Sequence, residues 1–292
     1  MYFSLPGMNE FRCLNGWFVD LYNSNGDFFY DDVILDNVYG SVPNVIWNGG
    51  RNHPVSNWKR EQIINLFEYY KNKRIKLRFT FTNMLLKNEH LYDEYANSVL
   101  DLINEYGYEI TIYSEVLEEY IRNKYPEIEM ISSTTKCILD IGRFNREVDR
   151  EYKLVVLDFR KNADFEFLDR ISNTYKVELL LNEDCYSTCE QRVRHYRDIS
   201  DNILHFDKLP DTEVYCRGKY RNLYESFGQK TTITVDDLYG KYKDMGFVHA
   251  KLRGRRSDYY DVLESYVYYL IKPRYRDMIR LEALQARLFN EE

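Results

Sequence analysis

Short apolar segments rich in β-branched and aromatic residues alternate along this chain with longer segments of helical period. Runs of this kind are typical of strands buried in a parallel sheet. The segments that we expect to form strands are Tyr2–Gly7, Asp32–Gly40, Val45–Gly50, Ile75–Asn83, Tyr108–Ser114, Glu127–Lys136, Lys153–Arg160, Lys176–Cys185 and Phe247–Gly254.

Between these segments, apolar residues recur every three or four positions, which is the spacing of an amphipathic helix. Ile63, Phe67 and Tyr70 share one such stripe, and Ser56 stands where the N-cap of that helix is expected. Gly107 is expected to end the next helix. The segments that we expect to form helices are Ser56–Lys73, Leu91–Gly107, Glu115–Pro126, Asp164–Tyr175, Thr234–Gly246 and one long helix from about Asp258.

Strands and helices that alternate at short intervals predict a parallel sheet with crossover helices. About eight strand signals favour a (β/α)₈ barrel, complete or distorted, over an open sheet. We expect residues 1–292 to form a single barrel domain, with a C-terminal helical extension from about residue 258.

In a barrel of this kind, the carboxyl ends of the strands line one opening, the mouth. The residues there would be mostly polar, with several Arg and Asn that suit anionic ligands. Loops after strands are polar in most proteins, so structural loop residues are the alternative. The expected mouth residues are Pro6, Gly7, Tyr39, Ser41, Asn48–Arg51, Thr82, Asn83, Ser114, Ser132–Lys136, Asp158, Arg160, Asn182–Cys185 and Arg253–Arg255.

Two cysteines follow one expected strand, Cys185 and Cys189. If Cys185 begins a helix, Cys189 lies one turn further on and Arg192 continues the stripe. With Cys216 downstream, three thiolates are available, which is how iron–sulfur clusters are usually held, although four ligands are normal. Tetrahedral zinc and plain buried thiols are the alternatives.

The composition of the chain limits the cellular compartments and the partners that we expect. The chain has 292 residues, 44% hydrophobic and 30% charged, with five cysteines and a net charge of −7. An odd, low cysteine count is unlike a disulfide-stapled secreted domain, and neither a signal peptide nor a membrane span is recognisable. We therefore expect a cytoplasmic protein, with neither a membrane nor bulk nucleic acid as a partner. A partner protein is compatible with the sequence.

The stretch "LLLNEDCYSTCEQRVRHY", Leu179–Tyr196, resembles the collagenase-like peptidase family of unassigned mechanism, family U32, in a divergent branch. Other segments match in the same order: "FSLPG", "VYGSVPNVIWNGGR", "RFTFTN", "SSTTK" and "TITVDDLYGKYKDMGFVHAKLRGR". The resemblance covers most of the chain. Its specific part is the cysteine pattern together with the order of the strand-end motifs.

The resemblance implies a barrel with a [4Fe–4S] cluster near its mouth, and Cys185, Cys189 and Cys216 match the family's cluster cysteines. Better-known members have a further cysteine near the position of "WNGGR", where this chain has none. The fourth ligand is therefore open: Cys13, Cys137 or a substrate atom at one iron. The remaining alternative is that this chain has lost the cluster.

Family members include oxygen-independent hydroxylases of quinone precursors and of RNA bases, so the first hypothesis is an iron–sulfur-dependent hydroxylation or related redox modification. The second is a peptidase, and the third a non-catalytic barrel used for binding or structure. A small anionic substrate or co-substrate would bind to Asn48, Arg51, Lys136, Arg192 and Arg255, and Glu183 and His195 are the candidates for proton transfer.

Overall fold

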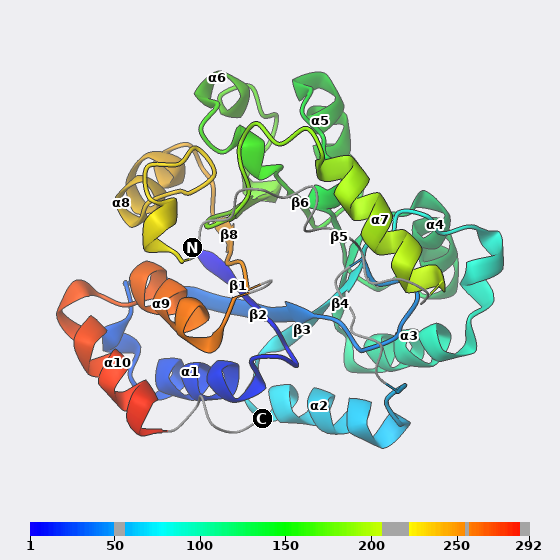
Figure 1. Cartoon of the computed structure of the whole chain (residues 1–292), viewed down its shortest axis with the longest axis horizontal. Coiled ribbons are helices and arrows are strands. Elements are labelled where there is room, and N and C mark those ends of the chain that lie inside the picture. Colours follow the sequence, from blue (N-terminus) through cyan, green and yellow to red (C-terminus); the bar gives the residue numbers. More distant parts are fainter. Residues whose placement is uncertain (50–55, 206–221, 255–256, 287–292) are drawn as a thin grey trace.

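The computed structural model describes residues 1–49, 56–205, 222–254 and 257–286. Eight parallel strands form a closed ring in sequence order, and Figure 1 shows the helices arranged around that ring. The predicted (β/α)₈ barrel is therefore confirmed. The strands are β1 Tyr2–Pro6, β2 Ile34–Gly40, β3 Lys76–Phe81, β4 Glu109–Ile112, β5 Met130–Ser132, β6 Leu154–Val156, β7 Val177–Leu180 and β8 His249–Lys251.

Most helices occupy the positions that connect one strand to the next. No helix in the part of the chain that the structure describes is long and apolar enough to cross a bilayer. The helices are α1 Arg12–Ser24, α2 Arg60–Asn72, α3 Glu94–Tyr106, α4 Glu115–Lys124, α5 Ile141–Val148, α6 Phe165–Leu168, α7 Arg192–His205, α8 Val235–Asp237, α9 Tyr259–Leu270 and α10 Arg276–Gln285.

Three sequence predictions are wrong in detail. Of the predicted strand Val45–Gly50, the described residues 45–49 are not a strand, because the chain turns there and the Asn48 N–H donates to the Val45 carbonyl over 3.0 Å. Helix α2 begins at Arg60, so Ser56 is not its N-cap. The long terminal helix is two helices, because α9 ends at Leu270 and Pro273 begins a separate turn.

The C-terminus of α3 is as predicted. Gly107 has φ +65°, and its N–H donates to the carbonyls of Asn104 and Ile103. A Cβ at Gly107 would meet nothing within 4 Å, so only backbone strain opposes a side chain. We expect Gly107→Ala to lower the free energy of unfolding by about 1 kcal/mol in urea denaturation. Gly26→Ala is the control, because Gly26 has equal space but no positive φ, and an equal loss there would refute the strain argument.

The main apolar core lies between the barrel wall and the helices. A second, separate apolar cluster consists of Ile131, Leu154 and Val156 on β5 and β6. Ser132, the neighbour of Ile131, donates to Glu147 on α5, so it faces outward. Because side chains alternate along a strand, Ile131 faces the barrel interior. The interior is thus apolar on the β5–β6 side.

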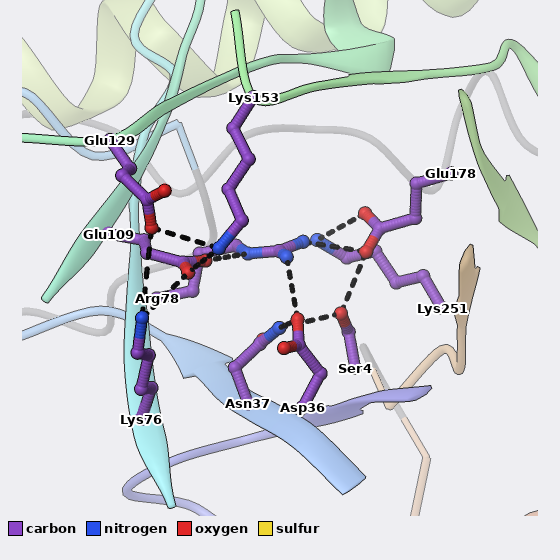
Figure 2. Close-up of polar contacts among 10 residues, drawn as sticks. All are labelled: Ser4, Asp36, Asn37, Lys76, Arg78, Glu109, Glu129, Lys153, Glu178 and Lys251. Carbon is purple, nitrogen blue, oxygen red and sulfur yellow. Dashed lines mark hydrogen bonds and ion pairs between the residues drawn. The ribbon is translucent and has the colours of Figure 1, made fainter. Parts of the chain in front are cut away.

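Another part of the interior holds charged side chains. Arg78 on β3 is fully buried and donates from Nη1 to Oε1 of Glu178 on β7 over 2.6 Å. Strands β3 and β7 stand opposite each other in the ring, so this contact crosses the interior. Glu109 on β4 accepts from Nε of Arg78 at 3.3 Å, and Asp36 lies 3.5 Å from Nη2. Figure 2 shows the guanidinium at the centre of these carboxylates.

We call Asp36, Arg78, Glu109 and Glu178 the interior ion cluster. Burial alone would raise the pKa of Glu178, but the charges of Arg78 and Lys251 outweigh it and hold that pKa at about 2. The cluster occupies the amino-terminal half of the barrel, since Glu109 begins β4 and Glu178 is the second residue of β7. Most barrels fill this space with Val, Ile and Leu.

Candidate functional site at the barrel mouth

The mouth holds a compact set of charged and polar side chains from the ends of β5 and β6 and from the start of α7. Asp158 follows β6, is 2% exposed, and accepts from Nε and Nη2 of Arg160 at 2.9 and 2.8 Å. Arg192, the first residue of α7, donates from Nη1 to the same carboxylate over 2.9 Å. One carboxylate therefore joins two guanidiniums, which leaves a net positive charge.

Arg192 is held on several sides. Its Nη2 donates to Oγ1 of Thr134 at 3.1 Å and to the hydroxyl of Tyr196 at 3.0 Å. Its guanidinium carbon lies 4.0 Å from the centroid of the Phe159 ring. Arg192 is 3% exposed, and its Nε–H has no hydrogen-bond partner. A buried guanidinium with an unused N–H is suited to an oxygen atom of a ligand.

Burial alone would raise the pKa of Asp158. Hydrogen bonds from Arg160 and the charges of Arg192 and Arg160 outweigh it and hold that pKa below its usual range. Cys137 lies in the turn after β5, with a backbone φ of +51°. Burial raises the pKa of its thiol, Asp158 adds to the rise, and the two arginines oppose it. We call Thr134, Cys137, Asp158, Arg160 and Arg192 the mouth cluster.

Glu183 lies beside this cluster in the loop after β7. Its carboxyl is partly buried, and Oε1 accepts from the backbone N–H of Asp184 at 3.0 Å. Burial, followed by the charge of Asp184, raises the pKa of Glu183 to about 7, against the opposing charges of Arg192 and Arg253. A carboxyl with this pKa can both accept and donate a proton near neutral pH.

Arg253, just after β8, fixes the loop on both sides of Glu183. Its backbone N–H donates to Oδ1 of Asn182 over 2.8 Å, and its Nε donates to the Asn182 carbonyl over 3.0 Å. Its two other nitrogens donate to Asp184 and to Asp261 of α9 at 3.3 and 3.2 Å. Arg253, itself bonded to Asp261 of α9, thus holds the two residues that flank Glu183.

Helix α7 lies along the rim of the mouth. Its first residue, Arg192, contacts the ends of β5 and β6, whereas Ser200 contacts residues just after β3. The Met84 N–H donates to Oγ of Ser200 over 3.1 Å, and the Asn83 amide donates to the Ser200 carbonyl over 3.3 Å. Figure 1 shows α7 over the side of the barrel where β4 and β5 lie.

The two cysteines of the loop do not lie on a helix, contrary to the prediction. The Cys189 N–H donates to the Tyr186 carbonyl over 3.1 Å and closes a turn, and α7 begins only at Arg192. The Cys189 carbonyl accepts from Nη1 of Arg160 over 3.0 Å, which ties the loop to the mouth cluster. Both cysteines are partly exposed.

The described residues alone do not form an iron–sulfur or zinc site. They contain no group of three or more His, Cys, Asp or Glu side chains that could hold a metal ion. A cluster needs about four ligands, and Cys185 and Cys189 supply two. Cys216, the third predicted ligand, lies outside the described residues, as do Arg51 and Arg255.

The side chains of the other predicted site residues have contacts outside the mouth cluster. Lys136 donates from Nζ to Glu147 over 2.5 Å and to the Tyr152 hydroxyl over 3.0 Å, in a network with α5. Asn48 is fully buried and donates to the Val42 carbonyl over 2.8 Å, although its Oδ1 has no partner. His195 is a partly exposed residue of α7 whose ring centroid is 5.9 Å from that of Tyr196. Of the predicted site residues, Glu183 and Arg192 are close enough for the charge of Arg192 to oppose the raised pKa of Glu183.

No family model matches the sequence, and neither does any curated protein. A comparison with solved structures finds one described as the U32 peptidase Mk0906, with a TM-score of 0.53 at 10% identity, covering 86% of this chain and 91% of that one. This chain has the fold of a U32 peptidase. The resemblance stated from the sequence motifs is confirmed for the fold, which at this identity is all that the likeness shows.

A U32 peptidase fold with a carboxyl of raised pKa at its mouth predicts a measurable stability change with pH. Folding favours the protonated form of Glu183, so this contribution is fully present below about pH 4.5 and is lost as pH rises through 7. Because the side chain is partly exposed, we expect the loss to be about 2 kcal/mol. Urea unfolding of wild type and Glu183→Gln at pH 5 and pH 8 measures it. The same pH dependence in both proteins would contradict the assignment.

Proposed function

We propose that this chain is an enzyme that hydrolyses peptide bonds at the barrel mouth, with Glu183 as the group that moves protons. The observation that carries the proposal is the position of Glu183, next to a buried cationic cluster at the carboxyl ends of the strands, where barrel enzymes have their active sites. The name of the solved structure with the same fold, a U32 peptidase, supports the choice of a peptide bond.

The residues of the mouth suit this chemistry. An ionised Glu183 can take a proton from the attacking water and return it to the leaving amine. The Nε–H of Arg192 can donate to the oxygen on which negative charge develops, and the positive charge of the mouth cluster favours that state. A substrate with a carboxylate group would be attracted by the same charge, in agreement with the anionic substrate expected from the sequence.

The test is a digestion of unstructured peptides by the purified chain, followed by mass spectrometry. We expect wild type to cleave and Glu183→Gln to cleave at least about 100-fold more slowly. Glu190→Gln is the matched control, because Glu190 is an exposed glutamate of the same loop and should leave cleavage unchanged. Equal cleavage by wild type and Glu183→Gln would assign the activity to another group or to a contaminant.

The second candidate is an iron–sulfur-dependent, oxygen-independent hydroxylation or related redox modification. One observation favours it: Cys185 and Cys189 lie on the loop that carries Glu183. Iron and acid-labile sulfide in equal amounts after anaerobic purification, lost in Cys189→Ala, would support this candidate. Protein without iron that cleaves peptides would support the first, and protein inactive in both tests would indicate a binding or structural module.

A further inference from the structure

The barrel interior contains buried polar atoms without hydrogen-bond partners. They belong to four strands: Oδ1 of Asn37 on β2, Nη2 of Arg78 on β3, Oγ1 of Thr111 on β4 and Oε2 of Glu178 on β7. All four side chains are at most 3% exposed. Three of them are neighbours in Figure 2, around the contact of Arg78 with Glu178 that crosses the barrel.

These atoms are complementary in kind. Arg78 offers an N–H, the amide oxygen of Asn37 and the carboxylate oxygen of Glu178 accept, and the hydroxyl of Thr111 can do either. Arg78 and Glu178 have ion-pair partners in Asp36 and Lys251, which offset part of the penalty. An unsatisfied buried polar group costs about 1–3 kcal/mol, so Asn37 and Thr111 alone would cost about 2–6 kcal/mol, a large part of the roughly 5–15 kcal/mol that stabilises a typical domain. Such groups are therefore expected to have partners from outside the chain.

The spacing around Glu178 fits a bridging water molecule. Nζ of Lys251 lies 4.0 Å from Oε2 of Glu178, too far for a direct hydrogen bond. A water about 2.8 Å from each atom spans such a gap. Nη2 of Arg78 and the Asp36 carboxylate are 3.5 Å apart, at the limit of direct bonding.

Lys251 links this region to the mouth. It is the last residue of β8, two positions before Arg253, and its ammonium lies 3.7 Å from the centroid of the Tyr39 ring. Its side chain is 10% exposed, whereas that of Glu178 is 1% exposed. Lys251 is thus the more solvent-accessible of the two, and Glu178 is the more deeply buried.

We propose that the barrel interior binds ordered water, in a hydrogen-bonded column that runs from Lys251 to the interior ion cluster. The ligand class is water because the site needs a neutral molecule that both donates and accepts. This inference does not depend on the proposed function. Such a column would give the mouth a path for protons through the interior of the barrel.

A high-resolution crystal structure of the whole chain tests the proposal directly. We expect ordered water within hydrogen-bond distance of Oε2 of Glu178, Oδ1 of Asn37 and Nη2 of Arg78. An interior in which these atoms instead bond to one another, without solvent density, would overturn it.

Solution measurements give a second test. Magnetic relaxation dispersion of water nuclei detects internal water with long residence times. The double variant Arg78→Met/Glu178→Leu replaces the central pair by apolar groups of similar size, and we expect its signal to fall by about half or more. Leu154→Met, in the apolar cluster, is the control and should leave the signal unchanged. An undiminished signal in a folded double variant would contradict the proposal, and if that variant does not fold, the crystal structure decides.

Discussion

Replacing Arg78 by Met is expected to lower the free energy of unfolding by about 3–5 kcal/mol. The substitution removes the buried cation that contacts Glu178, Glu109 and Asp36 together. Lys153 remains at Glu109, whereas Nζ of Lys251 lies 4.0 Å from Glu178. Burial already opposes ionisation of Glu178, so without Arg78 that carboxylate must take up a proton or draw in more water. Urea denaturation at pH 7 measures the loss.

The control is the double variant Arg78→Met/Glu178→Leu. Removing both partners takes away the attraction and the unpaired charge together, so we expect it to recover most of the lost stability. If the single variant is within about 1 kcal/mol of wild type, the interior ion cluster is not the tightly coupled unit described above.

Glu183→Gln is expected to lower kcat/KM for peptide cleavage about 10²- to 10⁴-fold, the range usual for loss of a general acid–base group. Glutamine keeps the shape and can still accept the hydrogen bond from the Asp184 N–H, but it cannot take up a proton. Any residual activity should no longer show the rise of kcat/KM with pH that ionisation of the carboxyl causes.

The wild-type pH profile tests the same assignment. If the ionised form of Glu183 is the base, kcat/KM should rise tenfold per pH unit below its pKa and level off above pH 7, since burial raises that pKa to about 7. A limb near pH 4.5 would mean that the carboxyl behaves as an exposed glutamate. An unchanged limb in Glu183→Gln would show that another group titrates.

The barrel could be predicted from the sequence because most strands are short apolar runs between segments of helical period. The interior could not be predicted in the same way. Three charged residues lie within or at the start of strands: Arg78, Glu109 and Glu178. A prediction from the hydrophobic pattern alone treats such residues as exceptions. The sequence signal that could have indicated a charged interior was the presence of charged residues in three predicted strands, at positions that would face inward. Pairing them required the register of strands on opposite sides of the ring.

The candidate site was predictable in part. Its location after β7 follows from the topology, and Glu183 and Arg192 were both named from the sequence. Lys136 was named as well, because it follows β5, but its side chain turns to Glu147 on α5. Single-sequence reasoning places a residue at a strand end without fixing where its side chain points. Asp158 illustrates the same limit, because its two arginine partners lie 2 and 34 residues away.

The path of α7 has a consequence for how the molecule can open. This helix is joined directly to the loop that carries Glu183, and Ser200, past its middle, is hydrogen-bonded to the chain just after β3. A displacement of that loop must therefore either shift the whole 14-residue helix or break its hydrogen bonds at Ser200. One helix thus ties together the ends of β3, β5 and β6, and we expect this part of the rim to move as a unit.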